Sequence, residues 1–105
     1  MHEVSVIIPN FNGKKYLKDC LDALLIQDFS SYEIVVVDNG SKDGSVQYLR
    51  QNYPQVRLVA LAENTGFCGA VNVGIRTSQA KYILLLNNDT IVEKGFIQAL
   101  VQDIK

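Results

Sequence analysis

Short apolar runs alternate along the whole chain with segments of helical periodicity, and this alternation constrains the fold more than any other feature. The runs that predict strands are 4–8, 33–37, 56–61 and 82–86, and the segments that predict helices are 14–27, a short stretch containing Val46, Leu49 and Tyr53, 66–77 and 93–104. Pro9 predicts the end of the first strand, because proline offers no backbone donor to a sheet. Strands that are apolar on both faces belong to parallel sheets covered by helices. The sequence therefore predicts an α/β fold, a three-layer αβα sandwich with a mainly parallel sheet.

The size and composition are those of one globular domain. The 105 residues predict a single domain over 1–105, and the net charge of -1, with no basic stripe, argues against nucleic acid and against a polybasic membrane contact. No apolar run approaches the roughly 20 residues of a membrane span. We expect a cytoplasmic protein, held at the inner face of the membrane only through further parts or partners. Cys20 and Cys68 have no metal-ligand spacing and are predicted to be buried, reduced thiols.

Polar residues gather in the segments that follow the four predicted strands. These segments are 9–13, 38–44, 63–69 and 87–90, and they are rich in Asn, Asp, Gly and Ser. Ligands of parallel sheets bind at the carboxyl ends of the strands, so these segments are predicted to meet at one edge and form a site. The alternative is that each loop holds only the turn formers and helix caps that its connection needs. Four polar loops at one edge favour the binding site.

Asp89 lies at the mouth of the last apolar run, within Asn87-Asn88-Asp89-Thr90. A carboxylate there suits Mg²⁺ or Mn²⁺, which would bind mainly through the diphosphate oxygens of a ligand. A structural role explains only part of the segment. Thr90 with Glu93 matches a capping box and predicts that the last helix starts there, but this cap does not require Asp89.

Asp38 and Asn39 end the second predicted strand. A carboxylate beside an amide suits the reading of a nucleobase edge or a ribose hydroxyl, and the alternative is an Asx turn that runs into Gly40. Both readings stay open at this point. The glycines do not match G-x-G-x-x-G, and no G-x-x-x-x-G-K-S/T occurs, so neither a Rossmann dinucleotide site nor a P-loop is predicted.

Four segments, in this order, resemble the signatures of family 2 glycosyltransferases of the GT-A fold. They are Val4-Ser5-Val6-Ile7-Ile8-Pro9-Asn10-Phe11-Asn12-Gly13, Val35-Val36-Val37-Asp38-Asn39-Gly40-Ser41, Glu63-Asn64-Thr65-Gly66-Phe67 and Leu86-Asn87-Asn88-Asp89. Within that family the chain is most similar to the rhamnosyltransferase-like bacterial enzymes of cell-wall and O-antigen assembly. The resemblance implies sugar transfer, with inversion at the anomeric carbon, from a dTDP-, UDP- or GDP-linked donor to a glycan or lipid-linked acceptor.

The resemblance also implies roles for particular residues. The donor-binding residues that it implies are Pro9, Asn10, Phe11, Asp38, Asn39, Asn64, Gly66, Asn72 and Asn88. Among these, Asp38 and Asn39 would contact base and ribose, and Phe11 replaces the family's usual tyrosine. Asn88 and Asp89 would fill the DXD-type motif, with Asp89 on Mg²⁺ or Mn²⁺. This motif lacks its first carboxylate, which predicts weak metal affinity without the donor.

No residue of the chain is predicted to be the catalytic base, because in this family the base and the acceptor-binding half follow the DXD-type segment. We therefore expect the donor-binding portion of a transferase, weakly active or inactive alone, with its base beyond Lys105. The alternative is a nucleotide-binding or interaction module that acts by itself. In that alternative an exposed edge strand pairs with a second copy and gives a homodimer.

Overall fold

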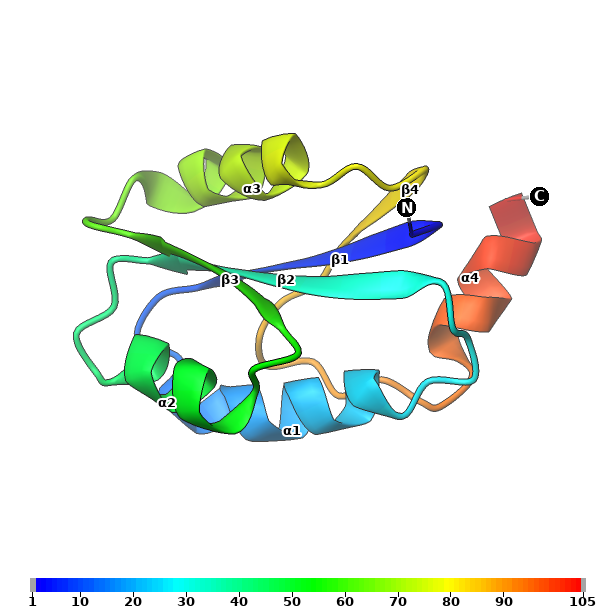
Figure 1. Ribbon diagram of the computed structural model, residues 1–105, viewed down its shortest axis with the longest axis horizontal. Helices are drawn as coiled ribbons and strands as arrows, with labels where there is room; N and C mark the ends of the chain where they lie inside the picture. The colour runs from blue at the N-terminus through cyan, green and yellow to red at the C-terminus, as the bar shows by residue number, and fades with distance from the viewer. Residues whose placement is uncertain (1, 105) are drawn as a thin grey trace.

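Four parallel strands form one sheet, and a helix follows each strand (Figure 1). The structure is a computed structural model and describes residues 2–104. Its elements are β1 (Val4–Asn10), α1 (Lys14–Leu25), β2 (Tyr32–Asn39), α2 (Ser45–Asn52), β3 (Arg57–Leu61), α3 (Gly66–Thr77), β4 (Tyr82–Leu85) and α4 (Phe96–Ile104). The strand order is β3-β2-β1-β4 and all neighbours pair in parallel. The predicted α/β class with a parallel sheet is confirmed.

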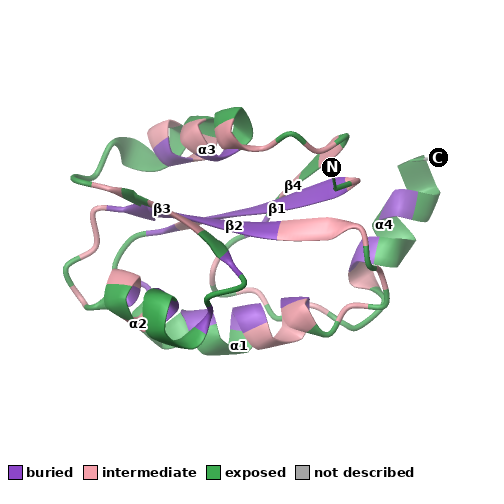
Figure 2. Cartoon of the chain, viewed as in Figure 1, coloured by how far each residue is buried: buried purple, intermediate pink, exposed green. Residues whose placement is uncertain are grey.

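Helices cover both faces of the sheet, so the two central strands are buried on both sides (Figures 1 and 2). On one face, α1, α2 and α4 pack against alternate residues of β1 and β2, among them Val6, Ile8 and Val36. On the other face, Ile7, Val35 and Val37 meet Ala70 of α3. Burial on both faces explains why the central strands are continuously apolar rather than alternating.

β1 continues through Pro9 to Asn10, two residues beyond the predicted end. Its pairing with β4 ends at Ile7, whereas its pairing with β2 continues as far as Asn10. In a parallel strand, residues two positions apart turn their N–H and C=O groups toward the same neighbouring strand. The Ile7 carbonyl accepts a hydrogen bond from the Leu86 N–H, directly after β4, so Ile7 and Pro9 both face the β4 side. The Pro9 nitrogen therefore faces the side where pairing has already ended. The sheet loses no hydrogen bond there, and the strand carries Asn10 to the edge of the sheet.

α4 begins at Phe96, so the predicted capping box of Thr90 and Glu93 is wrong. A side chain that follows α1 takes the role instead. Gln27 accepts a hydrogen bond from the Ile97 N–H at 3.0 Å and donates one to the Glu93 carbonyl at 2.7 Å. This capping partner is 70 positions away in the sequence, which a local pattern cannot reveal.

The two cysteines differ in exposure. Cys20 of α1 is buried, as predicted, but Cys68 is exposed, so the prediction was wrong for that residue. The face of α3 that meets the sheet carries Ala70 and Gly74, and Cys68 does not lie on it. A Cβ at Gly74 would approach Ile7 to 2.4 Å, which shows how closely this helix lies against the sheet.

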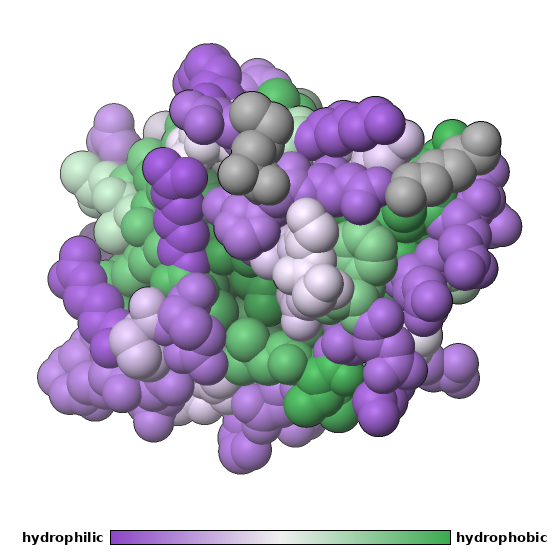
Figure 3. Space-filling model, turned by 45° about the vertical axis from the view of Figure 1, so that its right-hand side comes forward, coloured by the Kyte–Doolittle hydropathy of each residue, from purple (hydrophilic) through white to green (hydrophobic). Residues whose placement is uncertain are grey.

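β4 forms one edge of the sheet and leaves apolar side chains exposed. Ile83 and Leu85 are 42% and 43% exposed. A groove of about 170 Å³ runs beside them and is lined by Val4, Tyr82, Ile83, Leu84, Ile97, Leu100, Val101 and Ile104. Apolar residues also interrupt the polar surface on the face that Figure 3 shows. No helix within residues 2–104 has the length and apolar character needed to cross a membrane.

Candidate functional site

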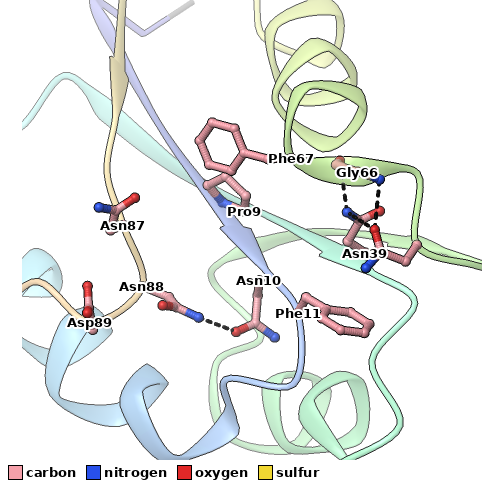
Figure 4. A pocket seen from close by; sticks show the side chains of 10 residues that line it. Pro9, Asn10, Phe11, Asn39, Gly66, Phe67, Asn87, Asn88 and Asp89 are labelled. Atoms are coloured by element: carbon pink, nitrogen blue, oxygen red, sulfur yellow. Dashed lines mark hydrogen bonds between the residues drawn. The ribbon is translucent and has the colours of Figure 1, made fainter.

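A cavity of about 440 Å³ opens at the carboxyl edge of the sheet, where the strands pass into their loops (Figure 4). It is lined by Pro9, Asn10, Phe11, Asn39, Asn64, Gly66, Phe67, Asn87, Asn88 and Asp89. These residues come from the ends of β1 and β2, the start of α3 with the loop before it, and the loop after β4. The cavity therefore lies at the edge where ligands of parallel sheets bind.

Asp38 lies behind this wall and fixes Asn10. It is fully buried, and its two carboxylate oxygens accept hydrogen bonds from Nδ2 of Asn10 and from the Ser41 N–H, both at 2.9 Å. A buried carboxylate requires such donors, because an unpaired one is costly. Asp38 is thus engaged by the protein itself, and its immediate effect is to orient the Asn10 side chain.

Asn10 in turn holds a side chain of the loop after β4. Its Oδ1 accepts a hydrogen bond of 2.8 Å from Nδ2 of Asn88 (Figure 4). The approach requires a glycine at position 13, where an added Cβ would lie 2.1 Å from Nδ2 of Asn88 and 2.7 Å from Oδ1 of Asn10. Within residues 2–104, Oδ1 of Asn88 accepts no hydrogen bond, so it remains available as an oxygen ligand.

The loops after β1 and β2 are also joined through Asp43. Its Oδ2 accepts the Lys14 N–H at the start of α1, at 3.0 Å, and its Oδ1 accepts the Ser45 N–H at the start of α2, also at 3.0 Å. Burial alone would raise the pKa of Asp43, but hydrogen bonds from Ser45 and Lys14 outweigh it and lower the pKa below its ordinary value. One carboxylate therefore accepts the first backbone N–H of both helices, a group that has no partner within its own helix.

Asn39 ties the end of β2 to the loop before α3. Its Nδ2 donates to Oδ1 of Asn64 and to the Gly66 carbonyl, each at 3.0 Å (Figure 4). Its Oδ1 accepts from the Thr65 N–H at 2.8 Å and from the Thr65 hydroxyl at 3.0 Å. Hydrogen bonds thus join neighbouring loops at the edge of the sheet in the order of the strands.

Asp89 is exposed and is the one carboxylate in the cavity wall. Beneath it, the Cys20 Sγ lies 3.9 Å from the carbonyl oxygen of Asn87. Burial and the negative charge of Asp89 raise the pKa of Cys20 to about 11, so this thiol stays protonated at neutral pH.

The oxygen atoms in the cavity wall suit a hard divalent cation only in part. Asp89 and Oδ1 of Asn88 are oxygen ligands of the kind that Mg²⁺ and Mn²⁺ prefer. Across the described part of the chain, no three His, Cys, Asp or Glu side chains gather in a way that could hold a metal. These residues therefore fit a cation that takes its remaining ligands from water and from a bound diphosphate.

Two aromatic rings complete the wall of the cavity. Phe11 and Phe67 are 48% and 57% exposed, although both are fully apolar (Figure 4). Exposed aromatic faces beside amides and a carboxylate offer surfaces on which a flat ring can stack.

The structure brings together most of the predicted site residues. Of the ten predicted, the cavity is lined by Pro9, Asn10, Phe11, Asn39, Asn64, Gly66, Asn88 and Asp89. Asp38 lies behind the wall, and Asn72 is exposed on α3 outside it. The prediction missed Phe67 and Asn87. Two features of the sequence could have indicated them: Phe67 is an aromatic residue directly after a loop glycine, and Asn87 is a further amide residue directly before Asn88.

A parallel sheet with a polar cavity at the carboxyl ends of its strands defines an open α/β protein of the kind in which ligands bind at that edge. Residues 5–105 match the model of glycosyl transferase family 2. The chain belongs to this family.

Named relatives and solved structures agree with this assignment. The chain is 32% identical to glycosyltransferase GlyG of Streptococcus pneumoniae serotype 4, over 97% of this chain and 35% of GlyG. The crystal structure of S. aureus TarS 1-349 in complex with UDP is similar, with a TM-score of 0.88 and 28% identity over 99% of this chain and 32% of that one. Mannosyltransferase PcManGT from Pyrobaculum calidifontis, in complex with GDP-Man and Mn²⁺, gives a TM-score of 0.73 and 27% identity over 85% of this chain and 28% of that one. The chain thus spans about a third of GlyG and of these two solved chains.

Proposed function

We propose that the cavity binds the nucleotide diphosphate part of a nucleotide-sugar donor. The observation that carries this proposal is the cavity itself, which combines exposed aromatic rings, amide groups and one carboxylate at the carboxyl edge of a parallel sheet. The proposal is supported by two similar proteins, since TarS has structures in complex with UDP and UDP-GlcNAc and PcManGT has one with GDP-Man and Mn²⁺.

In this proposal the two sides of the cavity bind different parts of the donor. The base and ribose lie against Phe11, Asn64 and Gly66, where an aromatic face and amide groups meet. The diphosphate lies toward Asn88 and Asp89. Asp38 acts through Asn10, because its own oxygens are already engaged.

The proposed cofactor is Mg²⁺ or Mn²⁺, held by Asp89, by Oδ1 of Asn88 and by the donor's phosphate oxygens. When bound, the cation would stabilise the negative charge that develops on the departing diphosphate. The protein residues hold the cation at one end of the cavity. With one carboxylate in the wall, affinity for the cation alone is expected to be weak and to rise when a diphosphate is present.

The proposed reaction is transfer of the sugar, with inversion, to a glycan or lipid-linked acceptor in bacterial cell-surface polysaccharide synthesis. A rhamnosyl donor is the specific candidate that the motif variants favour. An inverting transfer needs a base within reach of the acceptor hydroxyl. In the cavity wall the one carboxylate is Asp89, which we assign to the cation, so the base is proposed to come from residues outside this wall.

A thermal-shift panel tests donor binding. The protein is heated with UDP, dTDP and GDP, each with and without Mg²⁺ or Mn²⁺. A ligand at 100 times its Kd adds about 2.7 kcal/mol of stability, which is visible in a domain of this size. At least one nucleotide is expected to raise the melting temperature, more so with the cation. Absence of any shift at millimolar nucleotide would exclude the proposed donor site.

The edge formed by β4 favours a second proposal, self-association. Ile83 and Leu85 are exposed, and their N–H and C=O groups point away from β1, because Tyr82 and Leu86 use the other side of the strand. An open edge with apolar side chains is a template for pairing with another strand. A homodimer through this edge is compatible with the donor site, which lies at the carboxyl ends of the strands.

A further inference from the structure

The Asn39 side chain has no hydrogen-bonding capacity left for a ligand. A primary amide has two donor hydrogens and an oxygen with two lone pairs. Both donors are used, on Asn64 and on the Gly66 carbonyl, and the oxygen accepts twice from Thr65. The side chain is also only 4% exposed.

The orientation of this amide is fixed by backbone groups. The Gly66 carbonyl can only accept a hydrogen bond and the Thr65 N–H can only donate one. Exchanging the oxygen and nitrogen of Asn39 would place two acceptors against each other and two donors against each other. The Asn39 amide can therefore make these hydrogen bonds in one orientation only, and only while the 64–66 loop keeps this conformation.

A second contact between the same segments is independent of the amide. Gly40, with φ of +79°, lies so close to the loop that an added Cβ would approach the Glu63 carbonyl carbon to 2.6 Å and the Asn64 nitrogen to 2.8 Å. The end of β2 and the loop before α3 are thus packed together through both main chain and side chain.

This packing leaves one group of the loop for a ligand. Oδ1 of Asn64 accepts from Asn39 at 3.0 Å and from the Gly66 N–H at 2.7 Å. Over residues 2–104, Nδ2 of Asn64 donates no hydrogen bond, and the exposed Asn64 side chain lines the cavity. A donor in this place suits a carbonyl oxygen of a nucleobase or a ribose hydroxyl.

We propose that Asn39 is a positioning residue, which holds the 64–66 loop in the conformation that presents Asn64 to the base and ribose of the donor and does not itself contact the nucleotide. This inference rests on the proposed function. It replaces the expectation that position 39 reads the base directly and assigns that contact to Asn64.

The substitution Asn39→Asp tests the proposal, because it keeps the size and the acceptor oxygen but removes both donors. The new carboxylate would face the oxygens of Asn64 and Gly66. We expect amide hydrogen exchange at Thr65 and Gly66 to become faster in the free protein, and affinity for the nucleotide that binds the wild type to fall roughly tenfold at about pH 7.5. Asn52→Asp, with the same change at an exposed position of α2, is the matched control and should alter neither.

Acidification provides a rescue that a general loss of structure would not give. The new carboxyl group would be buried against two oxygen acceptors, and both causes raise its pKa above the ordinary value of about 3.9. Once protonated, it regains one donor, so both the slow exchange and the nucleotide affinity of Asn39→Asp should recover in part at about pH 5. The wild type sets the baseline at both pH values.

The outcomes separate this inference from the proposed function. Unchanged exchange at Thr65 and Gly66 in Asn39→Asp would overturn the positioning role, whatever the nucleotide does. Faster exchange with unchanged nucleotide affinity would overturn the link from this loop to the donor. Failure of the wild type to bind any nucleotide would overturn the proposed function, while the exchange measurement still decides whether Asn39 orders the loop.

Discussion

Asn88 donates a side-chain hydrogen bond of 2.8 Å to Asn10, although 78 positions separate them in the sequence. The contact joins the loop after β4 to the end of β1 and continues through Asn10 to the buried carboxylate of Asp38. The Asn88 side chain, which we propose as a metal ligand together with Asp89, is therefore oriented from the centre of the sheet.

The two ends of this contact should respond differently to substitution. Asn10→Ala removes a donor from the buried Asp38 carboxylate, so the free energy of unfolding should fall by about 1–3 kcal/mol. Asn88→Ala removes a partly exposed side chain at the open cavity, where water can replace its hydrogen bond to Asn10. It should therefore change stability by less than about 1 kcal/mol while weakening metal-dependent nucleotide binding. Urea unfolding and nucleotide titration measure the two effects. Equal destabilisation by both variants would contradict the proposal that Asp38 orients Asn10 and that Asn10 in turn orients Asn88.

Gly13 allows Asn10 and Asn88 to meet. Gly13→Ala places a methyl group where Nδ2 of Asn88 lies, so the Asn88 side chain must move away from Asn10 and nucleotide affinity should fall. Gly95→Ala is the matched control, because a Cβ there meets nothing within 4 Å. Isothermal titration of both variants checks the prediction. Equal nucleotide affinities would mean that the contact between Asn10 and Asn88 does not shape the site.

The cysteines give a prediction with a defined pH dependence. Cys68 should react quickly with a thiol reagent at neutral pH, whereas Cys20 should react only on unfolding, because it is buried and its pKa is raised to about 11. The folded-state pKa exceeds the ordinary value of 9.0, so the stability linked to Cys20 is fully present below about pH 9 and is lost as the pH rises to about 11. Labelling kinetics of wild type and Cys68→Ser check this. Rapid labelling of two thiols in the native wild type would contradict the burial of Cys20.

Self-association through β4 predicts an effect of charge at the sheet edge. Ile83→Lys and Leu85→Lys should shift the protein toward monomer, because a lysine on an exposed edge disfavours pairing with a second strand. Ile26→Lys, at a residue 62% exposed near the end of α1, is the control. Sedimentation velocity at high micromolar protein concentration distinguishes the variants. A monomeric wild type would exclude pairing through this edge.

The sequence predicted the sheet well because the pattern of apolar residues in its strands is clear. Strands buried on both faces require continuous apolar runs, which are easy to find in a sequence. In a parallel sheet, the loops that follow the strands all lie at the same edge, so the positions of the polar loops were predictable as well. That rule selected the segments that line the cavity, and the resemblance to family 2 glycosyltransferases implied most of the particular residues within them.

The errors arose where the outcome depends on distant parts of the chain. Pro9 ends strands in general, but here its nitrogen faces a side where pairing has already ended. The capping pattern at Thr90 was overridden by Gln27, which follows α1 and caps α4 instead. Sequence spacing also cannot tell whether a carboxylate at a strand end points into a cavity or lies beneath it, as Asp38 does.

We propose that Asp89 holds a cation at the diphosphate end of a nucleotide site, and Asp89→Asn tests this role most directly. The measurement is nucleotide affinity with and without Mn²⁺, by isothermal titration, for the wild type and for this variant of equal size. The wild type is expected to bind one of UDP, dTDP or GDP more tightly with Mn²⁺. The variant should lose that dependence while its unfolding free energy changes by less than about 0.5 kcal/mol. Nucleotide binding that Mn²⁺ strengthens equally in both proteins would contradict the assignment of Asp89.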